Sequence, residues 1–115
     1  MYTHGSLENE ILNAVWSIEE NETGAETISV NEVQDSINQT GNIRAYTTVK
    51  TVMDRLVDKK ILNRQKKGKK FFYNSAFSRK EMAKNAIRHI AGQYFNNDIR
   101  LFMNALEKEY QGIRK

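Results

Sequence analysis

The side chains best suited to recognising another molecule gather in the stretch AYTTVKTVMDRL, residues 45 to 56. Threonine hydroxyls can reach base edges or phosphate oxygens, the threonine methyl can contact thymine, and Lys or Arg can reach guanine or the backbone. The apolar residues of this stretch recur at helical spacing and predict a helix that buries its other face. The polar face of that helix carries Thr47, Thr48, Lys50, Thr51 and Arg55.

A second cationic group follows in the run KKGKK, residues 66 to 70, between ILNRQ and FFYNSAF. The flanking segments predict two strands joined by a glycine-containing turn, which would place Lys66, Lys67, Lys69 and Lys70 at the tip of a hairpin. Lysines there can contact phosphates without reading sequence. A solvated turn is the alternative, but the density of lysines favours contact. The adjacent aromatic residues 71 to 73 could stack on unpaired bases, yet we expect most of them to pack in the core.

Covalent and metal chemistry find little support in the sequence. The chain has no cysteine, and its two histidines, His4 and His89, belong to no HExxH motif. It has no GxGxxG motif and no phosphate-binding P-loop. Glu8 and Glu10 lie two residues apart and do not share a helical face, so we interpret them as favourable charges near a helix N-terminus. We therefore expect no enzyme, no cofactor and no metal site.

Charge is distributed very unevenly along the chain. Residues 1 to 41 hold eight acids and no Lys or Arg, whereas residues 42 to 88 hold fourteen Lys or Arg and three acids. A solvated surface normally mixes both signs, so this block favours a polyanionic partner, nucleic acid ahead of anionic lipid. An ordinary solvated face is the alternative.

The order of predicted elements is that of a winged helix-turn-helix. Ser6 can cap a first helix, the segment SIEENETGAE (residues 17 to 26) predicts an acidic loop, and residues 27 to 30 predict a short strand. Ser29 and Glu32 form a capping box for a second helix, which ends at the turn residues 40 to 42. The helix at residues 45 to 59 and the hairpin then follow. We expect a mainly α fold with a small β-hairpin, in which the third helix enters the major groove.

Residues 78 to 115 predict two further helices joined near residues 96 to 98. Their apolar stripes lie beyond an already complete small domain, and symmetric self-association would cover them. Packing back onto the same chain is the alternative. We expect a DNA-binding domain at residues 1–77 and a dimerisation region at residues 78–115, whose contacts include Ile87, Ile90, Tyr94, Ile99, Phe102, Met103 and Leu106.

The run from Ala45 to Phe77 resembles the penicillinase-repressor family of bacterial winged-helix regulators, which includes the methicillin-resistance repressor. HGSLENEILNAVW is similar to the first helix of that family, and ISVNEV to the lead into its second helix. The resemblance implies a homodimeric transcriptional repressor that binds a pseudo-palindromic operator and dimerises through C-terminal helices. It adds Tyr46 to the DNA-binding residues already named on the third helix and implies that residues 66 to 70 form the wing.

Some features leave alternatives open. Tyr46 lies nearer the apolar side of its helix, so it can pack or touch DNA. Arg55 can hold a phosphate or pair with Asp54 or Asp58. Family members that control β-lactamase are cleaved at an Asn-Phe bond, and the nearest counterpart here is Leu101-Phe102. Copper-responsive relatives carry paired cysteines, which this chain lacks. The inducing signal, whether protease, ligand or partner, therefore stays open.

The location of the protein follows from two further absences. No apolar run approaches the ~18 residues of a membrane span, and the start, MYTHGSLENE, lacks the pattern of a signal peptide. We therefore expect a cytoplasmic protein without a membrane partner. The alternative function is a winged-helix module that binds a protein or RNA and reads no DNA sequence.

Overall fold

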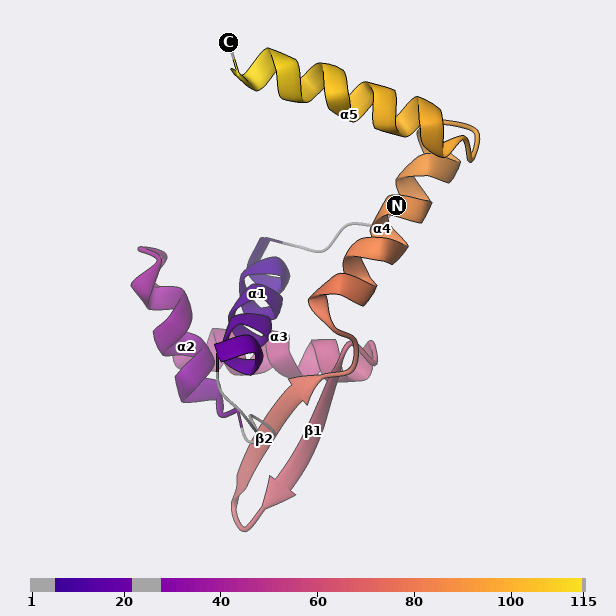
Figure 1. Cartoon of the computed structure of the whole chain (residues 1–115). Helices are drawn as coiled ribbons and strands as arrows, with labels where there is room; N and C mark the ends of the chain where they lie inside the picture. The colour runs from indigo at the N-terminus through magenta and orange to yellow at the C-terminus, as the bar shows by residue number, and fades with distance from the viewer. Residues whose placement is uncertain (1–5, 22–27, 115) are drawn as a thin grey trace. The chain divides into compact units, whose positions relative to one another are not determined.

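The computed structural model describes residues 6 to 21 and 28 to 114, which form five helices and one hairpin (Figure 1). The chain divides into two compact units, one ending at Arg79 and the other beginning at Lys80. The elements are α1 (Ser6–Asn21), α2 (Val30–Gln39), α3 (Tyr46–Asp58), β1 (Leu62–Lys67), β2 (Lys70–Ser75), α4 (Arg79–Tyr94) and α5 (Ile99–Arg114). The predicted fold class, mainly α with a small β-hairpin in winged helix-turn-helix order, is confirmed.

The core of the first unit lies where α1, α2 and α3 meet one another and the hairpin. The apolar face predicted for α3 is buried at Val49, Val52, Met53 and Leu56 and half-buried at Val57, and α3 packs against α1, α2 and β1. The side chains with the least exposure are Ile11, Leu12, Val15, Ile28, Val33, Val49, Met53, Leu56, Leu62 and Tyr73. None of the described helices is both long and apolar enough to cross a membrane.

The capping box at the start of α2 is confirmed. The Glu32 amide donates to Ser29 Oγ at 3.2 Å, and the Ser29 amide donates to the Glu32 carboxylate at 3.2 Å. The short strand predicted just before it shrinks to one bridge, in which the Tyr73 amide donates to the Ile28 carbonyl at 2.8 Å. Ser29 is the N-cap of α2 and Val30 is its first residue, so neither belongs to a strand. Thr27 lies outside the described residues.

The acidic loop predicted after α1 begins later than expected, since α1 continues to Asn21. Tertiary contacts hold its last turns. Ile18 packs against the core, and the Glu19 carboxylate accepts hydrogen bonds from the amide and hydroxyl of Ser75 at 2.9 and 2.7 Å. Glu20 pairs with Arg79 at 3.0 Å. The rest of the predicted loop, residues 22 to 26, lies outside the described residues.

The predicted hairpin forms with antiparallel register, pairing Leu62 with Ser75 at its base and Lys67 with Lys70 at its tip. Gly68 lies in the turn with a φ of 65°, a left-handed conformation that glycine adopts without a Cβ clash. The strands extend farther toward the turn than the sequence indicated, so that only Gly68 and Lys69 separate them, and they stop short of Ile61 and Phe77 at the base.

In the second unit, α4 and α5 are joined at the predicted position. Asn96 and Asn97 both have positive φ, 50° and 62°, which reverses the chain between the helices. Asp98 then caps α5 by accepting from the Arg100 amide at 3.0 Å. Phe95 and Phe102 stack with ring centroids 5.1 Å apart, so the joint has a small apolar contact of its own.

Candidate nucleic-acid interface

Helix α3 is held at both ends by carboxylates of α1. Lys59, the C-cap residue of α3, pairs with Glu8 at 2.9 Å. Arg44, just before α3, pairs with Glu10 at 2.7 Å, and the same carboxylate accepts from Asn42. The interpretation of the two glutamates as simple helix-end charges was therefore incomplete, because each is a long-range tether for α3.

The turn between α2 and α3 is fixed through the backbone of Arg44. Its amide donates to the Asn38 side-chain oxygen at 3.0 Å, and its carbonyl accepts from the Gln34 side chain at 3.0 Å. These two hydrogen bonds restrain the turn and therefore the angle between α2 and α3.

The outer face of α3 carries most of the residues proposed from the sequence in exposed positions. Thr47, Thr48, Thr51 and Arg55 are exposed, and Tyr46 is 42% exposed, so all five are accessible. The Thr51 hydroxyl donates to the Thr47 carbonyl at 2.8 Å, which uses its proton but leaves its oxygen free to accept. Among the described residues Arg55 forms no ion pair, so neither pairing considered for it is present.

Lys50 differs from the other candidates on α3 because its ammonium is already engaged. It pairs with Asp54, one turn later, at 2.7 Å. The Asp54 carboxylate also binds Arg64 at 3.0 Å and accepts from the Tyr73 hydroxyl at 2.7 Å. Neither Asp54 nor Arg64 was among the residues selected from the sequence.

This network changes the acid–base behaviour of its members. Burial acts to raise the pKa of Asp54, but the hydrogen bonds from Lys50, Tyr73 and Arg64 outweigh it and hold that pKa below its usual value. Burial, and then the hydrogen bond to the Asp54 carboxylate, raise the pKa of the Tyr73 phenol. Asp54 is thus charged and Tyr73 neutral at physiological pH.

The aromatic residues of β2 connect this network to the core. Tyr73 is fully buried, as expected, while Phe71 and Phe72 are half-buried. The ring of Phe71 lies 4.7 Å from the Arg64 guanidinium and about 5.6 Å from the Lys50 ammonium. These are cation–π distances, so Phe71 gives both cations a second attachment.

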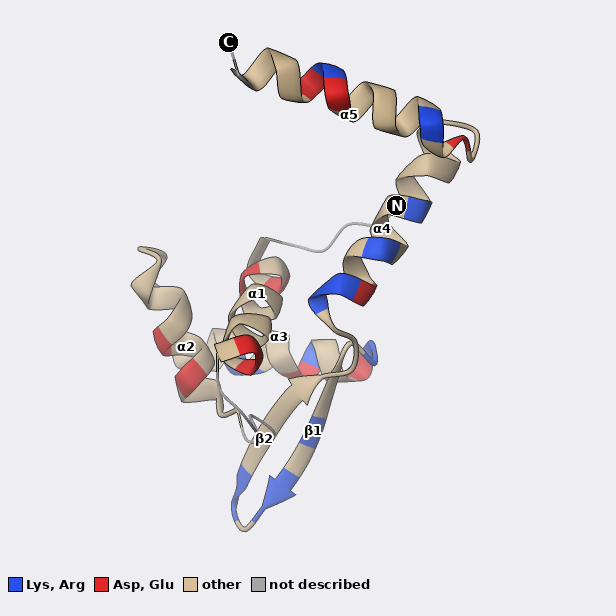
Figure 2. Cartoon of the chain, in the orientation of Figure 1, with Lys and Arg blue, Asp and Glu red and all other residues tan. Residues whose placement is uncertain are grey.

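The wing lysines form the largest group of unpaired cations among the described residues of the first unit. Lys66, Lys67, Lys69 and Lys70 are exposed and form no ion pair with any residue that the structure describes. Figure 2 shows the blue positions of the hairpin gathered toward its end. Lys66 also lies 5.7 Å from the Phe71 ring. The structure thus leaves these four charges available to an anion.

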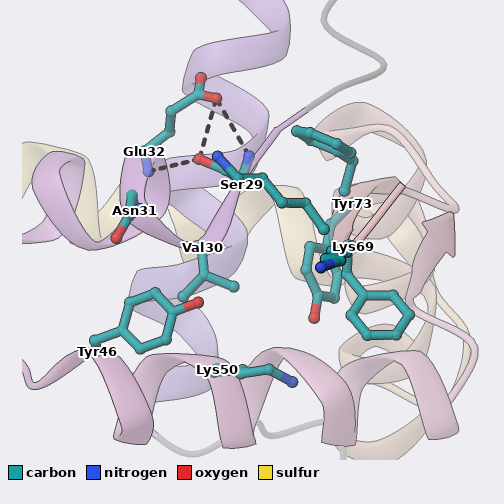
Figure 3. Close-up of a pocket in the computed structure, with 11 residues that line it drawn as sticks. Ser29, Val30, Asn31, Glu32, Tyr46, Lys50, Lys69 and Tyr73 are labelled. Atoms are coloured by element: carbon teal, nitrogen blue, oxygen red, sulfur yellow. Dashed lines mark hydrogen bonds between the residues drawn. The ribbon is translucent and has the colours of Figure 1, made fainter. Parts of the chain in front are cut away.

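A cavity of about 510 Å³ lies between the start of α2, the start of α3 and the wing (Figure 3). Tyr46 and Lys50 line it from α3, and Lys69 and Tyr73 line it from the hairpin. The Glu32 carboxylate at its edge is turned onto Ser29. The described residues contain no group of three His, Asp or Glu side chains that could hold a metal, and His4 lies outside them.

The sequence profile of a family described as penicillinase repressor matches residues 4–112. The chain belongs to the penicillinase repressor family. The family is one of regulatory repressors rather than enzymes. The resemblance carried by residues 45 to 77 is therefore confirmed, and it extends over both units.

Two solved structures share the fold of this penicillinase repressor family member. One is the monomeric form of Bacillus licheniformis BlaI in complex with the blaP half-operator. The two chains have 24% sequence identity and a TM-score of 0.50, and the match covers 69% of this chain and 87% of that chain. The other is the Vibrio cholerae ferric uptake regulator Fur: TM-score 0.52, 17% identity, 80% of each chain covered. No curated protein sequence matches the chain.

The second unit of the family member exposes most of the apolar residues that the sequence assigned to dimerisation. Ile87, Ile90, Tyr94, Ile99, Met103 and Leu106 have exposed fractions from 37% to 66%. Leu101, Tyr110 and Ile113, outside that assignment, are exposed as well. Phe102 differs, since it is 8% exposed and stacks on Phe95 within the chain.

Proposed function

We propose that the protein is a homodimeric transcriptional repressor that binds a pseudo-palindromic operator through α3 in the major groove and through the wing on phosphates. The observation that carries the proposal is the juxtaposition, in one compact unit, of an exposed threonine-rich helix face and four unpaired wing lysines. Membership of a repressor family supports it. BlaI, whose fold the chain shares, was solved on a half-operator.

The proposed division of labour on DNA follows from the chemistry of each group. Tyr46, Thr47, Thr48, Thr51 and Arg55 present hydroxyls, methyls and a guanidinium, which can distinguish base edges. The wing lysines are point charges and strengthen binding to any duplex by displacing counterions. Lys50 remains a DNA contact in this proposal, although its ammonium is paired with Asp54 before DNA binds.

The proposed dimer contact is the apolar face of residues 78–115, and residues 1–77 are the proposed DNA-binding domain. Large exposed apolar patches are rare on monomeric proteins, and a dimer would cover this one. Because Phe102 is buried against Phe95, we assign it to shaping the α4–α5 joint and assign the partner contact to exposed neighbours such as Leu106. A dimer would hold two α3 helices at a fixed separation on two half-sites.

The proposal places the protein in the bacterial cytoplasm, with operator DNA and a second copy of itself as partners and with no cofactor. The deciding experiment is selection of bound sequences from random duplex DNA, followed by comparison of the selected duplex with a scrambled one at ~150 mM salt. We expect a two-fold symmetric motif bound at least a thousandfold, ~10³, more tightly than scrambled duplex. Weak, salt-sensitive binding without a motif would overturn the proposal and favour a module that binds protein or RNA.

A further inference from the structure

We propose that Asp54 is a positioning residue that joins the reading helix α3 to the wing and thereby sets the preference for operator over other DNA. The inference rests on the proposed function. Asp54 has the wrong charge for a surface that binds a polyanion, since a carboxylate there repels phosphates. Its three polar contacts indicate what it does instead.

The Asp54 carboxylate connects three elements at once. Its Oδ2 accepts from Lys50 on α3 at 2.7 Å, and its Oδ1 accepts from Arg64 on β1 at 3.0 Å and from Tyr73 on β2 at 2.7 Å. Arg64 and Tyr73 are directly paired across the hairpin. One side chain of α3 therefore contacts both strands of the hairpin that carries the wing lysines, at the same level.

The hairpin end of this connection is anchored in the core. Tyr73 is fully buried in the core, and its amide is also tied to Ile28 at 2.8 Å. The carboxylate thus links α3 to a residue of the hairpin that is itself packed in the core. Arg64 and Lys50 are further confined by the Phe71 ring. Fixing these cations before DNA arrives lowers the cost of ordering them in the complex.

Direct base reading by Asp54 is a poor alternative. A carboxylate can accept from cytosine N4 in the major groove. In this structure, however, Oδ1 already accepts two hydrogen bonds and Oδ2 accepts one from Lys50, so turning the carboxylate toward a base would release Arg64 and the buried Tyr73 hydroxyl. A buried hydroxyl left without its partner is costly. The geometry therefore favours a link between α3 and the wing.

The test compares Asp54→Asn with Asp58→Asn. Both variants remove one acid from α3, but Asp58 is exposed and forms no ion pair with the described residues. Affinities for the selected operator and for scrambled duplex are measured across a salt series. If only charge matters, both variants bind both duplexes more tightly and the ratio of the two affinities stays constant.

A positioning role gives a different pattern. We expect the operator-to-scrambled ratio to fall about tenfold in Asp54→Asn, a change of about 1.4 kcal/mol, and to stay unchanged in Asp58→Asn. Lys50 and Arg64, released from Asp54, should steepen the salt dependence by about one unit for each additional phosphate that they neutralise. Equal ratios in the two variants would overturn the inference.

Two further measurements separate this inference from a loss of folding and from failure of the proposed function. Tyr73→Phe removes one hydrogen bond from Asp54 without changing charge. We expect it to lower the operator-to-scrambled ratio by about threefold and to be non-additive with Asp54→Asn.

Amide hydrogen exchange without DNA should be faster in β1 and β2 of Asp54→Asn than in the same strands of Asp58→Asn. If the unmodified protein prefers no operator, the proposed function fails, and exchange alone decides whether Asp54 couples the elements. Equal exchange would then overturn the coupling.

Discussion

Glu8 in α1 and Lys59 at the end of α3 form an ion pair of 2.9 Å although 51 positions separate them. Glu10 and Arg44 do the same at the other end of α3. The acidic N-terminal segment therefore neutralises part of the basic block that follows it. The excess charge that remains for an external anion is concentrated in the four wing lysines, Lys66, Lys67, Lys69 and Lys70, which have no carboxylate partner among the described residues.

Removing Lys59 should destabilise the protein, because the Glu8 side chain, only 11% exposed, loses its cation. We expect Lys59→Ala to lower the free energy of unfolding by about 1 to 2 kcal/mol. Urea unfolding at neutral pH measures this loss of unfolding free energy. Lys84→Ala is the matched control, since Lys84 is exposed and has no ion pair among the described residues. Equal losses in the two variants would show that the pair contributes nothing.

Removing a wing lysine should weaken binding to every duplex about equally. We expect Lys67→Ala or Lys69→Ala to lower the salt slope by about one unit for each lost phosphate contact. Titrations of operator and scrambled duplex at several salt concentrations measure the slope, with Lys84→Ala as control. A slope that does not change would place that lysine away from the backbone.

Removing the Thr47 side chain should weaken binding to the operator more than binding to random DNA. We expect Thr47→Ala to cost roughly 1 to 3 kcal/mol on the operator and less on scrambled duplex. Thr51→Ala should cost less than Thr47→Ala, because the Thr51 hydroxyl proton is already donated to the Thr47 carbonyl. Equal losses on both duplexes would exclude Thr47 from base reading.

Placing a charge on the exposed apolar face of α5 should separate the proposed dimer. Leu106 is 56% exposed, and we expect Leu106→Lys to give a monomer whose operator affinity falls about a hundredfold. Light scattering measures the mass. Asn104→Lys adds the same charge at an exposed polar position of α5 and should stay dimeric. A Leu106→Lys protein that remains a dimer would place the interface elsewhere.

The Asp54 network should make stability depend on pH at the acid end. The folded pKa of Asp54 lies below its unfolded value of about 3.9, so its contribution is fully present above that pH and is lost as the pH falls toward the folded pKa. We expect Asp54→Asn to have a flatter stability profile below pH ~4 than the unmodified protein. Urea unfolding between neutral and acid pH measures the profile. Asp58→Asn is the control, and a profile as flat as that of Asp54→Asn would contradict this prediction.

Much of the fold could be predicted because its signals are local. Helical spacing of Val49, Val52, Met53 and Leu56 identified the buried side of α3, and the Ser29 capping box marked the start of α2. Gly68 marked the wing turn. The candidate interface followed from the same signals, since a helix with one buried face must expose the other.

The sequence by itself determined the element order, the buried faces, the basic wing and the family resemblance, because each depends on residues within a few positions of one another. Only the tertiary structure decided that Glu8 and Glu10 hold α3, that Glu19 near the end of α1 binds Ser75, and that Asp54 joins Lys50 to the hairpin. It also showed that Phe102 is buried against Phe95 across the α4–α5 joint. The contacts of Asp54 with the wing span 10 and 19 positions, and that of Glu8 spans 51. Partners at such separations are chosen by how the elements pack, which no local pattern encodes.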